Sequence, residues 1–119
     1  MGAAPALVLN KVVQLMQVHR GLSAGMLSGD AALAARRPAA REALEKAMGD
    51  VAASFAAAQV PAAQASAWAQ AEQTWKTLEQ AVAARSLQTA QSTAQHTQLI
   101  ATIMLINEGL LHAYGLQTD

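Results

Sequence analysis

The sequence predicts an all-α protein that folds as an antiparallel up-down four-helix bundle. Ala supplies about a quarter of the 119 residues, aromatic residues make up only 3%, and β-branched residues are few. Apolar side chains recur at three- and four-residue intervals along four stretches of about 20 residues each. The connections between these stretches are short, which favours antiparallel neighbours. Residues 1–119 are expected to form a single domain, because the chain is too short for two independent cores.

The first helix is expected over Ala6–Leu27. Small residues gather in its second half, although each glycine costs up to ~1 kcal/mol relative to alanine in a helix. Either another group approaches the backbone closely here, or the helix frays toward a turn at Gly29–Asp30. The expected buried face consists of two adjacent stripes, each with polar members: Val8, Val12, Leu15, His19, Leu22 and Met26, beside Leu9, Val13, Met16, Arg20, Ser23 and Leu27.

The second helix is expected to begin at Pro38, because proline suits the first position of a helix. The segment Asp30–Arg37 is therefore predicted to be a connection, with at most a helical turn at Ala31–Ala35. The second helix ends before Val60–Pro61, and the third begins near Pro61. Apolar residues of the third helix follow the alternating spacing typical of antiparallel bundles, and both indoles are expected in the core: Trp68, Ala71, Trp75, Leu78 and Val82.

The fourth helix is expected to begin at Ser86 or Thr89, to run to Tyr114 and to end at Gly115. In an up-down bundle it is the antiparallel neighbour of the first helix, with the two midpoints near residues 101 and 16. Arg20 should then lie level with residue 97, opposite His96. The same reckoning places Asn107 and Glu108 near Asn10 and Lys11. The expected seam of the fourth helix is Thr93, His96, Ile100, Ile103, Asn107, Leu110 and Tyr114.

Composition argues against several classes of function. Eight basic and eight acidic residues cancel at pH 7, so no cationic excess favours nucleic-acid binding. The absence of cysteine excludes disulfides, thiolate metal sites and cysteine nucleophiles. The longest apolar run, Leu99–Ile106, is far shorter than the roughly 20 residues that cross a bilayer. Membrane attachment is therefore expected only through segments outside this chain, and the N-terminus does not resemble a secretory signal.

The residues also argue against an enzyme. No paired carboxylates share a face, and no glycine-rich phosphate loop or His-x-x-x-His motif occurs. The carboxylates Glu42, Glu45, Glu72 and Glu79 have the spacing of solvent-facing residues. Histidine phosphotransfer domains require Lys and Gly three and four residues after the histidine, and neither His19 nor His96 is followed by that pair. Two histidines give only weak support to a haem or metal site, so no cofactor and no metal are predicted.

Arg20 is the residue from which a binding site can be argued. At the edge of a bundle core, an arginine usually lays its stem on apolar surface and extends its guanidinium into water. Alternatively, a recessed guanidinium captures a small planar anion through two parallel hydrogen bonds. Ser23 lies one turn further along the same face and could add a hydroxyl donor. His96 could add a second donor from the fourth helix, with charge when protonated, and His19 completes the candidate set.

The segment around Arg20 resembles the opening helix of nitrate- and nitrite-sensing (NIT) domains. Gln17 and the run Arg20-Gly21-Leu22-Ser23-Ala24-Gly25 match the family's pattern, while His19 stands where the family usually has Glu. The resemblance covers residues 14–29, and residues 96–116 match more loosely. Family members are all-helical sensor modules attached to receptors, kinases, cyclases or transcription antiterminators. By this resemblance Arg20 binds nitrate, and the chain is part of a longer bacterial signalling protein, either periplasmic on a membrane-anchored receptor or cytoplasmic.

The resemblance also exposes a difference from the family. Family domains supply a second binding arginine from a later helix, whereas this sequence has no Arg or Lys after Arg85. Either His96 substitutes for it, a partner subunit contributes it, the missing part of the domain holds it, or the nitrate role is lost.

We therefore predict an input domain that binds a small anion, nitrate or nitrite, between the first and fourth helices through Arg20, Ser23, His96 and His19. Binding would favour one helix register and pass it to an attached output. The alternative is an assembly module without a small-molecule ligand. In that case the small-residue face formed by Gly21, Ala24 and Ser28 pairs with a second copy, and a homodimer is expected in either case.

Overall fold

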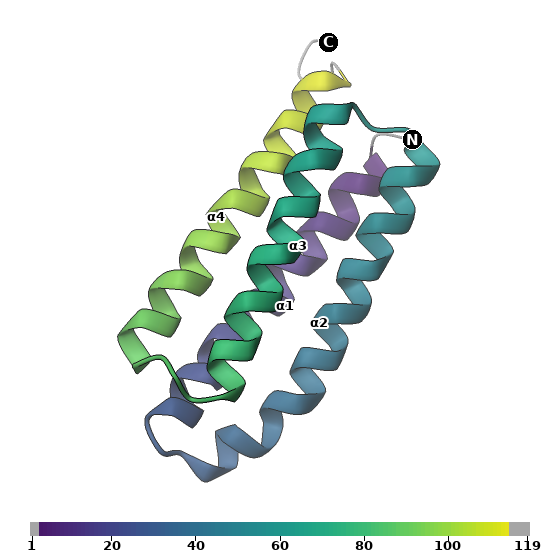
Figure 1. Ribbon diagram of the computed structural model, residues 1–119. Coiled ribbons are helices and arrows are strands. Elements are labelled where there is room, and N and C mark those ends of the chain that lie inside the picture. The colour runs from purple at the N-terminus through teal and green to yellow at the C-terminus, as the bar shows by residue number, and fades with distance from the viewer. Residues whose placement is uncertain (1–2, 115–119) are drawn as a thin grey trace.

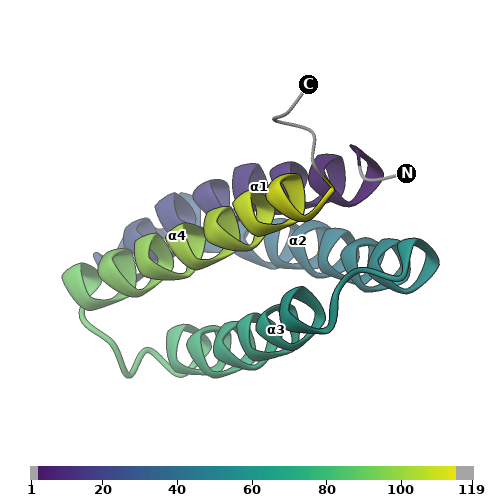
Figure 2. The same ribbon diagram turned by 90° about the horizontal axis from the view of Figure 1, so that it is seen from above.

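The structure, a computed structural model, describes residues 3–114 and consists there of four helices in an up-down arrangement (Figure 1). They are α1 (Ala3–Leu27), α2 (Ala31–Ala58), α3 (Ala62–Ala83) and α4 (Thr89–Ala113). The bundle measures 49 × 23 × 22 Å. Helix α1 packs against both α2 and α4, and α3 packs against α4. Seen from above, α3 is set apart from the other three helices (Figure 2). The predicted fold class, an all-α antiparallel bundle, is confirmed.

Helix α2 begins seven residues earlier than the sequence predicted, so the expected connection over Asp30–Arg37 was wrong. Asp30 accepts a hydrogen bond from the backbone N–H of Leu33 at 3.0 Å and so caps the helix at its N-terminus. Pro38 consequently lies inside α2 rather than at its first position. Proline there removes one N–H of a helical hydrogen bond. The Asp30 cap and the alanine-rich first turns outweigh the preference of proline for a helix start.

The turn between α1 and α2 explains some of the small residues in α1. Helix α1 continues to Leu27, so the fraying interpretation does not hold. Gly29 has a φ of +95°, which favours glycine, and reverses the chain. At Gly25 an added Cβ would come within 2.8 Å of the Leu33 Cβ, so α2 approaches the α1 backbone too closely for a side chain. At Gly21, by contrast, nothing lies within 4 Å of such an atom.

The remaining helix ends follow the predictions closely. Helix α2 stops at Ala58, before Gln59 in the left-handed conformation and Pro61 at the start of α3. Helix α4 begins at Thr89, the later of the two predicted starts, because the side chains of Gln88 and Gln91 form a reciprocal capping box. The predicted C-terminal cap at Gly115 lies outside the described residues.

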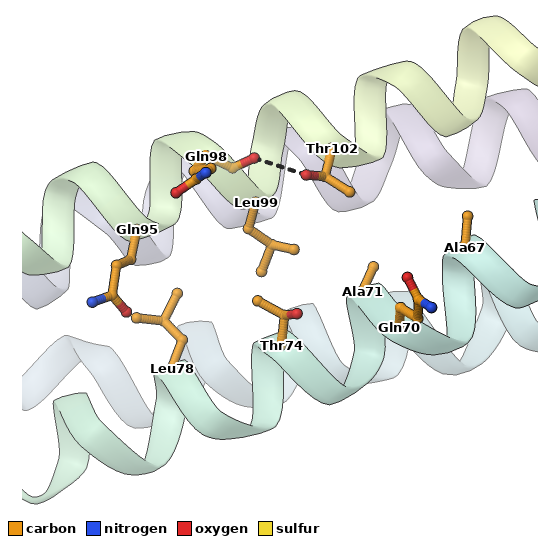
Figure 3. Close-up of a pocket in the computed structure, with 9 residues that line it drawn as sticks. All are labelled: Ala67, Gln70, Ala71, Thr74, Leu78, Gln95, Gln98, Leu99 and Thr102. Carbon is orange, nitrogen blue, oxygen red and sulfur yellow. Dashed lines mark hydrogen bonds between the residues drawn. The ribbon is translucent and has the colours of Figure 1, made fainter.

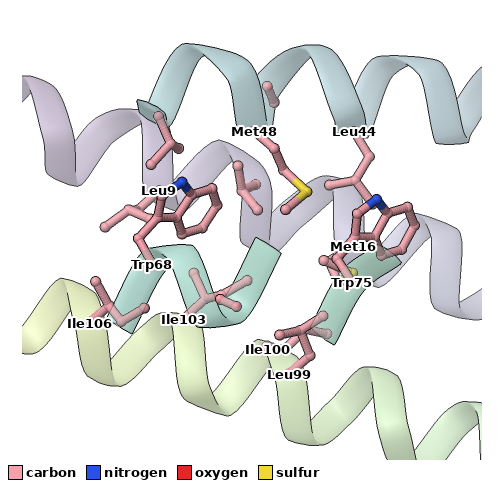
Figure 4. Packing of buried hydrophobic residues seen from close by; sticks show 14 of the residues in the cluster. Leu9, Met16, Leu44, Met48, Trp68, Trp75, Leu99, Ile100, Ile103 and Ile106 are labelled. Atoms are coloured by element: carbon pink, nitrogen blue, oxygen red, sulfur yellow. The ribbon is translucent and has the colours of Figure 1, made fainter. Parts of the chain in front are cut away.

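The core is a continuous apolar cluster to which all four helices contribute (Figure 4). Trp68 and Trp75 are 3% and 2% exposed, so the prediction that both indoles lie in the core is confirmed. Their bulk fills the space between α3 and the other helices. Over residues 3–114, no helix combines the length and the apolar character that spanning a bilayer requires.

Candidate functional site

The contact between α1 and α4 has the predicted register. The Arg20 guanidinium donates a hydrogen bond to the hydroxyl oxygen of Thr97 at 3.0 Å. Nearer the other end of the pair, the side-chain amide of Asn107 donates to the Asn10 side-chain oxygen at 3.2 Å. Both contacts confirm the alignment that was expected from the helix midpoints. Arg20 is half-buried at the edge of this seam rather than enclosed in it.

Directly inside the seam, His19 of α1 and His96 of α4 contact each other. His19 Nδ1 lies 2.9 Å from His96 Nε2, and both side chains are completely buried. Each imidazole also lies beside a buried serine of its own helix, Ser23 for His19 and Ser92 for His96. Trp75 of α3 meets His19 edge-on, with a ring-centroid distance of 4.8 Å. The structure therefore brings together His19, Ser23 and His96, three of the four candidate residues.

The hydrogen bonds fix which ring nitrogens carry the protons. His96 Nδ1 lies 2.7 Å from the backbone carbonyl oxygen of Ser92, which can only accept, so Nδ1 is the protonated nitrogen. In a neutral imidazole Nε2 is then an acceptor, and it receives a hydrogen bond from His19 Nδ1. The remaining nitrogen, His19 Nε2, accepts from an Arg37 guanidinium nitrogen 3.3 Å away. The three hydrogen bonds therefore run in one direction. Arg37 of α2 donates to His19 of α1, His19 donates to His96 of α4, and His96 donates to the α4 backbone.

This geometry requires both imidazoles to be neutral, and their electrostatic surroundings agree. Burial lowers the pKa of His19 from 6.5 to about 3, and the positive charges of protonated His96, Arg37 and Arg41 act in the same direction. Burial also lowers the pKa of His96, opposed by its hydrogen bond to the Ser92 backbone and reinforced by the charge of Arg20. His96 therefore carries no positive charge at neutral pH with which to attract an anion.

Charged residues that were not among the predicted site residues continue this network into α2 and α3. Arg37 is only 8% exposed, although its segment was predicted to be a connection. Its guanidinium lies 3.5 Å from a carboxylate oxygen of Glu79, and that of Arg41 lies 3.3 Å from the same oxygen. The expectation that Glu79 faces solvent was wrong, because its side chain is 13% exposed between the two guanidiniums. A signal was present in the sequence: the apolar stripe of α2 extends backward from Leu44 to positions 41 and 37.

A second feature, a groove between α3 and α4, differs in character from this network (Figure 3). It has a volume of about 600 Å³ and forms where α3 presents small side chains toward α4. Its lining carries amides and hydroxyls but no charged group: Ala67, Gln70, Ala71, Thr74, Leu78, Gln95, Gln98, Leu99 and Thr102. Without a cation it does not suit an anion. Within residues 3–114, no three histidine or carboxylate side chains converge as a metal site would require.

The structure is thus an all-helical bundle in which a buried chain of polar contacts draws on side chains from all four helices. Comparison with known families identifies the family. The family model described as nitrate and nitrite sensing matches residues 11–116, and the chain belongs to this family. It is a family of sensor domains rather than of catalysts. No curated protein and no solved structure matches the chain.

Proposed function

We propose that this domain binds nitrate or nitrite at the seam between α1 and α4, with Arg20 as the direct contact. The observation that carries the proposal is that the Arg20 guanidinium is partly buried without a carboxylate partner among the described residues. It is half-buried, and its hydrogen-bond partner across the seam is the neutral hydroxyl of Thr97. Among residues 3–114, no carboxylate lies within ion-pair distance of it. A planar anion would satisfy this charge through two parallel N–H bonds.

The other three candidate residues lie behind Arg20, and we assign them to the floor of the proposed site. His19, Ser23 and His96 are fully buried, and their polar atoms bond to one another or to the neighbouring residues Ser92 and Arg37. Anion binding would draw α1 and α4 into a different register. In that register the His19 N–H and the Ser23 hydroxyl would turn toward the bound anion. The signal is then a population shift between two arrangements of α1 and α4.

Calorimetry and thermal shift with nitrate, nitrite and chloride test this proposal. Arg20→Ala is expected to abolish nitrate binding and leave the fold intact, because Arg20 lies at the edge of the core. Arg20→Lys should weaken binding, since an ammonium group cannot make the planar two-point contact. Arg36→Ala is the matched control, because it removes the same charge from an exposed position on α2.

Binding of nitrate at a hundredfold excess over Kd should raise the stability of the wild type by roughly 2.7 kcal/mol. No nitrate-dependent shift at millimolar concentration would exclude this bundle as a nitrate receptor. An equal loss of binding in Arg36→Ala and Arg20→Ala would show that only overall charge matters.

The second candidate function is assembly through the small-residue face of Gly21, Ala24 and Ser28. The observation in its favour is the open space at Gly21, together with large apolar side chains that are exposed on α1 and α4: Leu7, Val18, Met104, Leu105 and Leu111. Analytical ultracentrifugation of the wild type beside Gly21→Leu tests it. Because a Cβ atom at Gly21 would have no neighbour within 4 Å inside the subunit, a dimer that survives the change excludes this face as the contact.

A further inference from the structure

Two arginines of α2 converge on one carboxylate of α3. Arg37 and Arg41 are one helical turn apart, and both guanidiniums approach the same oxygen of Glu79, at 3.5 and 3.3 Å. The Arg37 and Glu79 side chains are 10% and 13% exposed, whereas that of Arg41 is 38% exposed and open to solvent. A buried carboxylate is thus held between two cations, one of which is accessible from outside.

The Glu79 carboxylate fits this position loosely. Charge-assisted hydrogen bonds between a guanidinium and a carboxylate are usually about 2.7–2.9 Å long and often bidentate. Here both contacts are longer and share a single oxygen. The Arg41 Nε is buried and has no hydrogen-bond partner, so a donor suited to a bidentate contact is unused. Because Glu79 is tethered to α3, its carboxylate cannot move freely to improve this geometry.

The charges in the cluster do not balance. Two guanidiniums face one carboxylate, and the nearest group from α1, the His19 imidazole, is neutral because burial lowers its pKa. The cluster therefore carries one more positive charge than negative, and part of this charge is exposed to solvent at Arg41. A monovalent anion that takes the place of Glu79 leaves this balance unchanged, so its advantage over Glu79 lies in the geometry of its hydrogen bonds.

We propose that Arg37 and Arg41 form a second anion site, selective for small planar oxyanions, in which Glu79 acts as an internal ligand that a free oxyanion replaces. The site lies between α2 and α3 and does not involve Arg20. A nitrate or a small carboxylate is untethered, so it can reach both guanidiniums at short distance and use the free Arg41 Nε. Since Arg37 also donates to His19 Nε2, occupancy of this site is transmitted to the His19–His96 contact.

The test is a calorimetric titration of the whole chain with sodium nitrate, sodium acetate and sodium chloride. Glu79→Gln removes the internal carboxylate with nearly the same shape, so nitrate and acetate should bind at least about tenfold more tightly than to the wild type. Glu42→Gln is the matched control, because it makes the same charge change at an exposed residue beside Arg41. Glu79→Asp, which withdraws the carboxylate by one methylene, should give an intermediate gain.

Two further variants locate the binding. Adding Arg41→Gln to Glu79→Gln should remove the gain, and adding Arg20→Ala should leave it intact, since the two sites are separate. The double variant of Glu79→Gln and Arg20→Ala lacks the Arg20 site. A gain in affinity that persists in it supports the second site even if the proposed site at Arg20 does not bind nitrate. Equal affinities of Glu79→Gln and Glu42→Gln would overturn the proposal. A gain for chloride as large as that for nitrate would overturn its selectivity for planar oxyanions.

Discussion

The buried His19–His96 pair should make the stability of the domain depend on acid. The unfolded chain takes up a proton at His19 below its ordinary pKa of 6.5, whereas the folded protein does so only near pH 3. Between these values the unfolded state binds more protons, so stability is greatest above pH 6.5 and declines as the pH falls. Each unit of pKa difference corresponds to about 1.4 kcal/mol. Below about pH 3 the contribution of His19 levels off.

The expected loss for His19 between pH 7 and pH 5 is about 2 kcal/mol, and His96 adds to it because its pKa is also lowered. Urea unfolding followed by far-UV circular dichroism at a series of pH values measures this change. His19→Gln should flatten the slope, because the amide can accept from Arg37 and donate to His96 without titrating. The matched control is His112→Gln, which makes the same substitution at an exposed histidine and leaves both buried imidazoles in place.

An unfolding free energy that stays constant from pH 7 to pH 5 would refute this reasoning. The same holds if His19→Gln retains the full slope of the wild type, since carboxylates would then account for the acid dependence. Nitrogen chemical shifts of the imidazoles give an independent check. Both rings should be neutral with the proton on Nδ1, and a proton on His96 Nε2 would contradict the direction assigned to the hydrogen bonds.

Three further predictions concern stability, each measured by urea or thermal unfolding. Trp75→Ala should cost about 3–5 kcal/mol as a large-to-small change in the core, and a cost below about 1 kcal/mol would mean that the indole is not packed as described. Pro38→Ala should stabilise the protein by about 1–3 kcal/mol by restoring a helical hydrogen bond, and any destabilisation would argue for a structural role of the ring. Gly21→Ala should stabilise the protein by about 0.5–1 kcal/mol, because nothing lies near the added Cβ. Gly25→Ala should destabilise the protein by about 1–3 kcal/mol, because the added Cβ overlaps Leu33. Equal effects of the two substitutions would contradict the different surroundings of the two glycines.

The sequence was sufficient to predict the number of helices, their order and the register of α1 on α4. Apolar spacing identifies the buried face of each helix, and short connections require antiparallel neighbours. The level of Arg20 with residue 97 and the nearness of Asn10 to Asn107 followed from helix lengths alone. The run that begins at Arg20 also indicated the family to which the chain belongs.

The start of α2 could not be predicted in the same way. Local signals conflicted there, because Asp30 suits an N-cap while Pro38 suits the first position of a helix. The predicted start at Pro38 rested on the proline, whereas in the folded chain the Asp30 cap sets the start of the helix and the proline is tolerated inside it. This error also removed Arg37 from the set of candidate core residues.

Only the tertiary structure decided what the buried polar residues contact. Spacing along one helix shows which way a side chain faces but not what lies opposite it. His19 meets His96 across 77 residues of sequence, and Arg37 meets Glu79 across 42. The pKa of an imidazole depends on its burial and on charges contributed by other helices, so the neutral state of His19 and His96 follows from the packing of all four helices.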